Sequence, residues 1–197
     1  MIARNVLFGG TFDPVHNAHI EIACAAAERF RLEKVLFVPA ANPPHKSRGA
    51  HASYEDRIRM CELACASEPR FEVSRIEQDS RRSYSILTIE KLLAAGMGPL
   101  GFLIGADAFS EIQTWHRWRE VVRVVEFIVV TRPGATYVSP EGARIHELGG
   151  LYLPVSSSDI RLRLARGDEH IPVPDAVLAY IREHHLYQDP ETQSQVL

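Results

Sequence analysis

The stretch FGGTFDPVHNAHI, residues 8–20, joins a short apolar run to an alanine-rich segment near the start of this 197-residue chain. NVLF (5–8) is typical of a buried strand, and NAHIEIACAAAERF (17–30) is typical of a helix. Glycines between them let the backbone approach a ligand, and the helix that follows offers unpaired N–H groups and the positive end of its dipole. The stretch therefore predicts a strand–loop–helix unit able to receive a phosphate.

The same alternation continues along the chain. Further strands are expected at 34–40, 71–77, 100–106, 126–132 and 151–155, and further helices from Ser53, Ser85, about Trp115, Ser157 and Pro174. Several strands are apolar on both faces, which predicts an α/β fold with a doubly wound, Rossmann-like, mostly parallel sheet and helices on both faces. We expect one domain over 1–197, with 156–197 as a small C-terminal helical part, and long loops at 42–52 and 132–150.

Composition narrows the class of protein. The net charge of −3 argues against bulk binding of nucleic acid, although positive charge gathered locally would suit an anionic small molecule. No apolar run reaches the roughly 18 residues of a membrane span, and the N-terminus lacks a signal-peptide pattern. Three cysteines, an odd number, suit a reducing compartment. We therefore expect a cytoplasmic protein.

His16 and His19 lie three residues apart on the first turn of the first expected helix. Side chains with this spacing share one face of a helix, so both imidazoles would point toward the same anion. No third ligand at a metal-like spacing accompanies them, and we expect no protein-held metal site. Metal ligation, and a structural role in which the rings only cap and pack, are the alternatives.

Two other loops leave strands at the sheet edge where such folds bind ligands. In NPPHKS (42–47) two prolines stiffen the backbone that presents Lys46, although a solvated loop would explain that segment taken alone. In VSSSDIR (155–161) three serines at a helix start precede Arg161, whose guanidinium suits phosphate. Helix capping would explain one serine better than three with an arginine.

GADAFSEIQTWHRW (105–118) follows a later strand of the same sheet. This position places Asp107 to accept hydrogen bonds from sugar hydroxyls and Trp115 to stack on a flat ring. Core packing explains Trp115 equally well, and we expect Trp118 in the core.

These motifs, in this order, resemble those of the bacterial nicotinate mononucleotide adenylyltransferases, within the nucleotidyltransferase superfamily marked by a His-x-Gly-His motif. The matching segments are GGTFDPVHNAH, PPHK, SYS, GAD with TW, RPG and SSSDIR. They run from Phe8 nearly to the end of the chain. Three features depart from the family pattern. Ala18 replaces its glycine, and Ser158 replaces its threonine. The asparagine often seen just before the prolines is displaced, with Ala40 and Ala41 ahead of Asn42.

The resemblance implies transfer of AMP from ATP to nicotinate mononucleotide in NAD biosynthesis, with Mg²⁺ carried by the triphosphate. It implies a catalytic set that stabilises phosphate charge: His16, His19, Lys46 and Arg161. For ATP the implied contacts are Gly9, Gly10, Thr11, Phe12, His16, His19, Gly105, Asp107, Ser156, Ser157, Ser158 and Arg161. For nicotinate mononucleotide they are Lys46, Tyr84, Ser85, Asp107, Trp115, His116 and Arg132.

Two alternatives stay open. One is adenylyl or cytidylyl transfer to another phosphorylated acceptor, such as phosphopantetheine, against which a stacking Trp115 and the chain length argue. The other is a nucleotide-binding regulator without catalysis, against which both histidines, Lys46 and Arg161 argue. The expected partners are ATP and nicotinate mononucleotide, without nucleic acid or membrane. A homo-oligomer is compatible with the sequence, which also leaves the choice between nicotinate and nicotinamide open.

Overall fold

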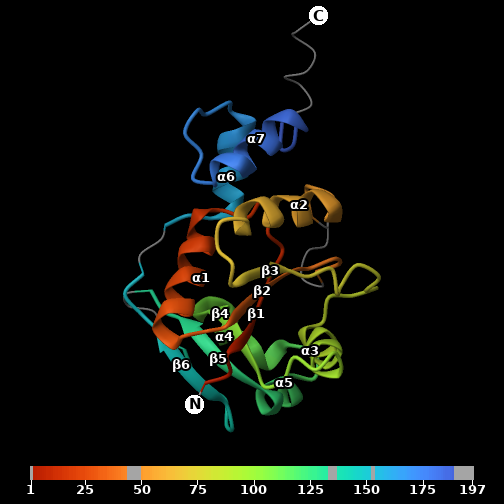
Figure 1. Ribbon diagram of the computed structural model, residues 1–197, viewed down its shortest axis with the longest axis vertical. Coiled ribbons are helices and arrows are strands. Elements are labelled where there is room, and N and C mark those ends of the chain that lie inside the picture. Colours follow the sequence, from red (N-terminus) through yellow and green to blue (C-terminus); the bar gives the residue numbers. More distant parts are fainter. Residues whose placement is uncertain (1, 44–49, 133–136, 152–153, 189–197) are drawn as a thin grey trace, which may run out of the picture.

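A computed structural model describes residues 2–43, 50–132, 137–151 and 154–188. Six parallel strands form one sheet in the order β3-β2-β1-β4-β5-β6 (Figure 1). The strands are β1 Asn5–Gly10, β2 Lys34–Pro39, β3 Phe71–Val73, β4 Leu100–Gly105, β5 Val125–Val130 and β6 Arg144–Leu148. The order reverses between β1 and β4, and ligands of such folds bind at the carboxyl ends of the strands beside that point. The predicted doubly wound, Rossmann-like sheet is confirmed.

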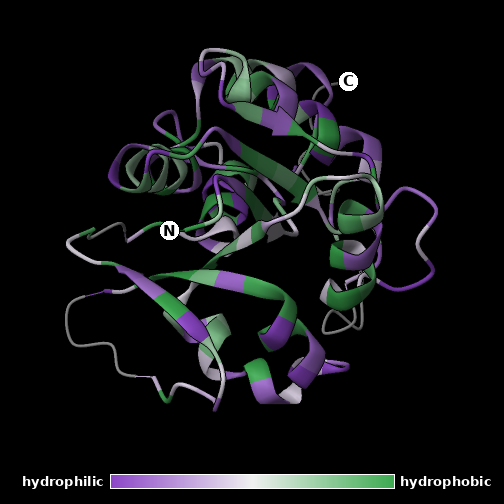
Figure 2. Ribbon diagram, turned by 60° about the horizontal axis from the view of Figure 1, so that its bottom comes forward, coloured by the Kyte–Doolittle hydropathy of each residue, from purple (hydrophilic) through white to green (hydrophobic). Residues whose placement is uncertain are grey.

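Helices cover both faces of this sheet. They are α1 Asn17–Phe30, α2 Tyr54–Cys65, α3 Ser85–Ala94, α4 Ala106–Ser110, the 3₁₀ turn η1 Ile112–Thr114, α5 Trp118–Val124, α6 Ser157–Ala165 and α7 Asp175–Glu183. Val6 and Phe8 face the hydrophobic cluster that α1, α2, α6 and α7 share, whereas Leu7 faces the cluster shared by α3, α4 and α5. Alternate residues of β1 thus point to opposite faces. Figure 2 shows polar and apolar bands on the helices, as expected when one side of each is buried.

The C-terminal helices pack against the sheet domain through the first of these clusters. Ile160 of α6 and Val177 and Ile181 of α7 are buried in it, and the hydroxyl of Tyr180 donates to Asp56 of α2 over 2.9 Å. In Figure 1, α6 and α7 lie beyond α2, at the end of the molecule opposite α5. The segment therefore shares a hydrophobic core with the sheet.

The last strand differs from the sequence prediction. We expected a strand at 151–155 and a loop at 132–150, but β6 runs through residues 144–148, and residues 151, 154 and 155 are not in a strand. The β6 strand lies at the sheet edge and is polar because Arg144 and His146 both pair with Glu126 of β5, at 3.6 and 3.2 Å. It therefore lacks the apolar run that marked the inner strands.

Two boundaries also differ, and one short helix was not predicted. The helix expected from about Trp115 begins at Trp118, because Trp115 ends η1 in an extended conformation. The strand expected at 71–77 stops at Val73. The five-residue helix α4 was not predicted, since a single turn is too short to show a helical period.

Candidate active site

The opening loop leaves β1 and places the ring of Phe12 next to the α-carbon of Gly10. A Cβ atom on Gly10 would lie 3.0 Å from the ring of Phe12, which is tighter than most Cβ contacts in proteins, so the ring would have to shift slightly. Phe12 has a left-handed backbone (φ 49°), and its buried ring packs edge-on against His19 with the ring centroids 5.0 Å apart. The Phe12 ring therefore lies in the core, where it packs against a histidine, and the ATP contact expected of this residue stays a prediction.

His16 and His19 stack at the start of α1, with ring centroids 3.6 Å apart. The backbone N–H of His16 donates to Nδ1 of His19 over 3.1 Å, so a neutral His19 carries its proton on Nε2. Burial lowers the pKa of His16 to about 4. Burial, reinforced by the neighbouring His16 charge, also holds the pKa of His19 well below its usual value. At pH 7 the pair therefore offers N–H donors without net charge.

Ala18 stands between these histidines in the first turn of α1. Its backbone is not among those with positive φ, and its methyl group is buried. Alanine at this position thus causes no left-handed backbone strain.

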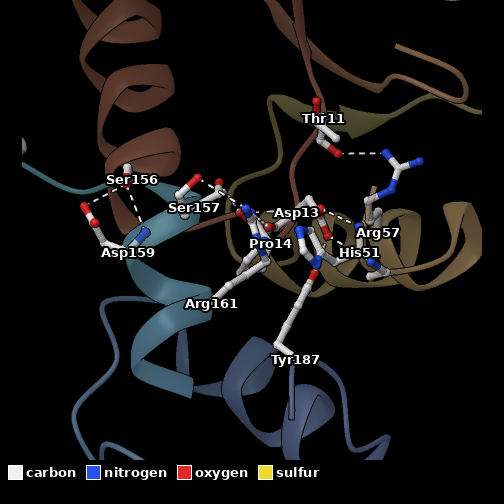
Figure 3. Close-up of polar contacts among 12 residues, drawn as sticks. Thr11, Asp13, Pro14, His51, Arg57, Ser156, Ser157, Asp159, Arg161 and Tyr187 are labelled. Atoms are coloured by element: carbon white, nitrogen blue, oxygen red, sulfur yellow. Dashed lines mark hydrogen bonds and ion pairs between the residues drawn. The ribbon is translucent and has the colours of Figure 1, made fainter. Parts of the chain in front are cut away.

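The serines of SSSDIR all have partners in the structure. Ser156 caps α6 by accepting from the N–H of Asp159 at 3.1 Å. Ser157 donates to the carbonyl of Pro14 at 3.0 Å (Figure 3). Ser158 accepts from Arg161 at 3.2 Å. The motif therefore attaches α6 to the opening loop, in addition to presenting hydroxyls near it.

Asp13 is the centre of this attachment, and the sequence did not single it out. Its buried carboxylate accepts from the N–H groups of His51 and Ala52, at 2.8 and 3.0 Å, and from the hydroxyl of Tyr187 at 2.9 Å. Arg161 donates to its backbone carbonyl at 2.8 Å and lies 4.0 Å from its carboxylate (Figure 3). Burial alone would raise the pKa of Asp13, but these donors hold it below its usual value.

Arg57 is a second residue that the sequence analysis missed. It is 1% exposed and donates to the carbonyls of Thr11 and Ala40, at 2.7 and 2.8 Å, just past the ends of β1 and β2. The sequence could have indicated its burial, because Arg57 lies four residues before the buried Cys61, on the apolar face of α2. A charged side chain on the buried face of a helix needs hydrogen-bond acceptors inside the protein, because burial without them is energetically costly.

A cavity of about 670 Å³ opens beside this loop at the same sheet edge. Its lining residues are Gly10, Thr11, Ala40, Pro43, Ser83, Tyr84, Ser85, Ala108, Glu111, Thr114, Trp115 and His116. Tyr84 and His116 stack with centroids 4.4 Å apart, and Trp115 packs on Phe102 at 5.8 Å. The cavity thus has aromatic walls and includes the start of α3, where a helix leaves its first N–H groups free for an anion.

Buried Glu77 links two segments that line this cavity, the loop after β2 and helix α3. Its carboxylate accepts from the N–H of Ala41 at 3.2 Å and from the hydroxyl of Thr88 in α3 at 2.5 Å. On the exposed side, the N–H of Asn42 donates to the hydroxyl of Ser83 at 2.9 Å. The loop after β2 is therefore bound to the segment that begins α3.

Four further predicted site residues are not among the described residues that line the aromatic cavity. Gly105 and Asp107 are exposed at the start of α4, at the end of β4. Arg132 lines a separate cavity of about 720 Å³ near β6, and so is not brought to the aromatic cavity. Lys46 lies outside the described residues. Within those residues, no three His, Cys, Asp or Glu side chains gather closely enough to hold a metal ion.

Comparison with known proteins identifies the family of this chain. The family model "Cytidylyltransferase-like" matches residues 7–163. A protein of Solibacter usitatus named "Probable nicotinate-nucleotide adenylyltransferase" is 56% identical over 184 residues, covering 92% of this chain and 97% of its own. The chain belongs to the nicotinate-nucleotide adenylyltransferase family. A Streptomyces coelicolor member with the same name is 40% identical, covering 91% of this chain and 98% of its own.

Solved structures show the family fold. The nicotinic acid mononucleotide adenylyltransferase of Plasmodium falciparum, complexed with NaAD, superposes with a TM-score of 0.76 at 17% identity, covering 93% of this chain and 97% of its own. The complex of the Plasmodium enzyme with APC gives 0.75 over the same shares. In the part of our chain that the structure describes, no helix is both long and apolar enough to cross a bilayer.

Proposed function

We propose that this chain transfers AMP from ATP to nicotinate mononucleotide, forming deamido-NAD and pyrophosphate. The observation that carries the proposal is the junction of the loop that leads to the two histidines with an aromatic cavity on one sheet edge. Gly10 and Thr11 belong to both, since they leave β1 toward the histidines and also line the cavity. A nucleotide phosphate at the loop and a pyridine nucleotide in the cavity would therefore adjoin. The names of the relatives support this assignment.

The acceptor needs no activation, because its 5′-phosphate oxygen is already anionic. That oxygen attacks the α-phosphorus of ATP directly, a new P–O bond forms, and the bond to the bridging oxygen breaks, so that pyrophosphate leaves with the electron pair. Neither a general base nor an enzyme nucleophile is required. The protein's task is to align two anions and stabilise the charge that develops between them.

The two histidines and Arg161 suit that task. Nε2–H of His19 would donate to a phosphate from the start of α1, where the helix dipole also favours negative charge. A triphosphate beside the imidazoles would raise their pKa values and strengthen those hydrogen bonds. Arg161, held by the backbone carbonyl of Asp13 and the hydroxyl of Ser158, would supply positive charge beside the same loop.

Mg²⁺ is expected to arrive on the triphosphate. Mg²⁺ prefers oxygen ligands, and among the described residues no three His, Cys, Asp or Glu side chains gather to hold it, so we expect the oxygens of the nucleotide and water to be its main ligands. When bound, it would withdraw charge from the leaving pyrophosphate.

In the cavity, Trp115 would stack on the pyridine ring, and the first N–H groups of α3, near Tyr84 and Ser85, would receive the carboxylate. The acceptor contacts of Lys46, Asp107 and Arg132 remain predictions from the family resemblance.

Pyrophosphate release tests the proposal. With ATP and Mg²⁺ present, nicotinate mononucleotide, nicotinamide mononucleotide and phosphopantetheine are compared as acceptors. We expect rapid release with nicotinate mononucleotide and none with phosphopantetheine. Release only with phosphopantetheine would contradict the proposal, and ATP binding without turnover for any acceptor would favour a regulator.

A further inference from the structure

Arg117 directly follows Trp115 and His116 of the aromatic cavity but does not line it. Its backbone is left-handed, with φ 53° and ψ 38°, at the residue before α5. Residues other than glycine adopt this conformation infrequently, and they keep it where surrounding interactions hold them. The side chain of Arg117 supplies such interactions.

Four hydrogen bonds join this guanidinium to two carboxylates. Nε and Nη2 donate to Glu120 of α5 at 2.7 and 2.6 Å, and Nη2 and Nη1 donate to Glu90 of α3 at 2.6 and 3.3 Å. The first pair is local, but Glu90 is 27 residues away in sequence. We call these three residues the Arg117 clamp. It ties the segment that carries Trp115 and His116 to α3.

The N-terminal end of α3 forms the facing wall of the cavity. Ser85 begins this helix five residues before Glu90, and the ring of the N-cap residue Tyr84 stacks on His116. Two segments thus meet at the cavity through stacked rings and farther along α3 through the clamp. Since stacked rings slide easily, a directional bidentate contact is better suited to keep the segments in register.

We propose that Arg117 is a positioning residue for the acceptor nucleotide, whose clamp sets the spacing of the two aromatic walls. This inference rests on the proposed function, which makes the cavity the acceptor site. Loss of the clamp would weaken acceptor binding without affecting ATP, because the loop of His16 and His19 does not depend on α5. Exposed ion pairs are weak individually, so the expected effect is moderate.

The test compares Arg117→Gln with Arg75→Gln. Arg75 is a matched control because it also contacts two carboxylates, Glu55 at 2.5 Å and Glu62 at 3.5 Å, and does not line the cavity. In Arg117→Gln, KM for nicotinate mononucleotide should rise about fivefold, the upper range for exposed pairs, while kcat and KM for ATP stay near wild type. Arg75→Gln should leave all three unchanged.

A double-mutant cycle, measured by the acceptor KM, distinguishes a specific role of Arg117 from a general loss of stability. Because Arg117 acts through Glu90, the Arg117→Gln/Glu90→Ala double variant should raise the acceptor KM no further than Arg117→Gln alone. Three results would each overturn the proposal. The two substitutions could raise the acceptor KM additively, Arg117→Gln could leave the acceptor KM at the value of the control variant, or Arg117→Gln could raise KM for the acceptor and for ATP equally. If Arg117→Gln does not fold, Arg117→Lys replaces it. An unchanged acceptor KM in Arg117→Lys would likewise contradict the proposal. Wild-type protein without pyrophosphate release would instead overturn the proposed function.

Discussion

Tyr187 donates a hydrogen bond of 2.9 Å to the buried carboxylate of Asp13, across 174 residues of sequence (Figure 3). The same carboxylate accepts from the N–H groups of His51 and Ala52, and Arg161 binds the backbone carbonyl beside it. One acidic residue, through its side chain and its backbone carbonyl, thus joins the opening loop to the segment before α2, to α6 and to the chain beyond α7. The loop that precedes the histidines is therefore held in part by residues near the C-terminus.

Tyr187→Phe should loosen this arrangement. Removing the hydroxyl deprives a buried carboxylate of a donor, so the free energy of unfolding should fall by about 1–2 kcal/mol. KM for ATP should rise, because the anchors of Arg161 weaken. Urea denaturation and initial rates measure the two effects. Tyr180→Phe is the control, since it loses a bond of equal length to Asp56, away from the loop. An equal ATP KM in both variants would contradict the prediction.

His19→Ala should lower turnover without unfolding the protein. Loss of one donor to a developing negative charge commonly costs about 3 kcal/mol, roughly a hundredfold in rate. The measurements are kcat for pyrophosphate release and thermal unfolding by circular dichroism. His170→Ala, at an exposed position, provides the control. Near-normal turnover in His19→Ala would remove this residue from the catalytic set.

Stability should fall as the pH drops from about 6.5 to 4. Unfolded histidine binds its proton near pH 6.5, whereas folded His16 does so only at about 4. Between these values the unfolded state holds more protons, so acid favours unfolding, and His16 alone accounts for about 3 kcal/mol. His19 acts in the same direction. The lowered pKa of Asp13 adds stability that is lost at still lower pH.

Urea denaturation at several pH values between 7 and 4 measures this dependence. His16→Asn removes one of the two buried imidazoles, so its stability should depend less steeply on pH than that of the wild type. Parallel curves for the two proteins would show that His16 is not the titrating group.

Trp115→Ala should weaken acceptor binding specifically. Stacking of a base on an aromatic side chain is worth about 1–3 kcal/mol, so KM for nicotinate mononucleotide should rise about tenfold or more. KM for ATP should change little. Trp118→Ala is the matched control, because Trp118 is also partly buried but packs under Arg119 and does not line the cavity. Similar acceptor KM values in the two variants would rule out stacking on Trp115.

The sequence predicted the sheet because its evidence was local. The apolar run of β1, the glycines and the alanine-rich α1 are contiguous, and each carries its own pattern. The polar edge strand β6 escaped prediction, since it pairs with β5 along its whole length without carrying an apolar run of its own.

The site was predicted in part for the same reason. The histidines and the serines of SSSDIR stand in recognisable motifs, but the partners of Asp13 are 38, 39, 148 and 174 residues away. No local pattern reports such contacts. The hydrogen bonds of Arg57 to Thr11 and Ala40 likewise depend on how α2 crosses two strand ends.

Arg57 has an electrostatic consequence for the whole edge. Carbonyl oxygens at the ends of parallel strands carry partial negative charge, which would repel an incoming polyphosphate. Two of them, on Thr11 and Ala40, are turned onto a guanidinium that solvent hardly reaches. Salt screens a buried charge far less than an exposed one. A protein with a net charge of −3 can thus keep a locally attractive field for anions at ionic strengths that would erase a surface patch.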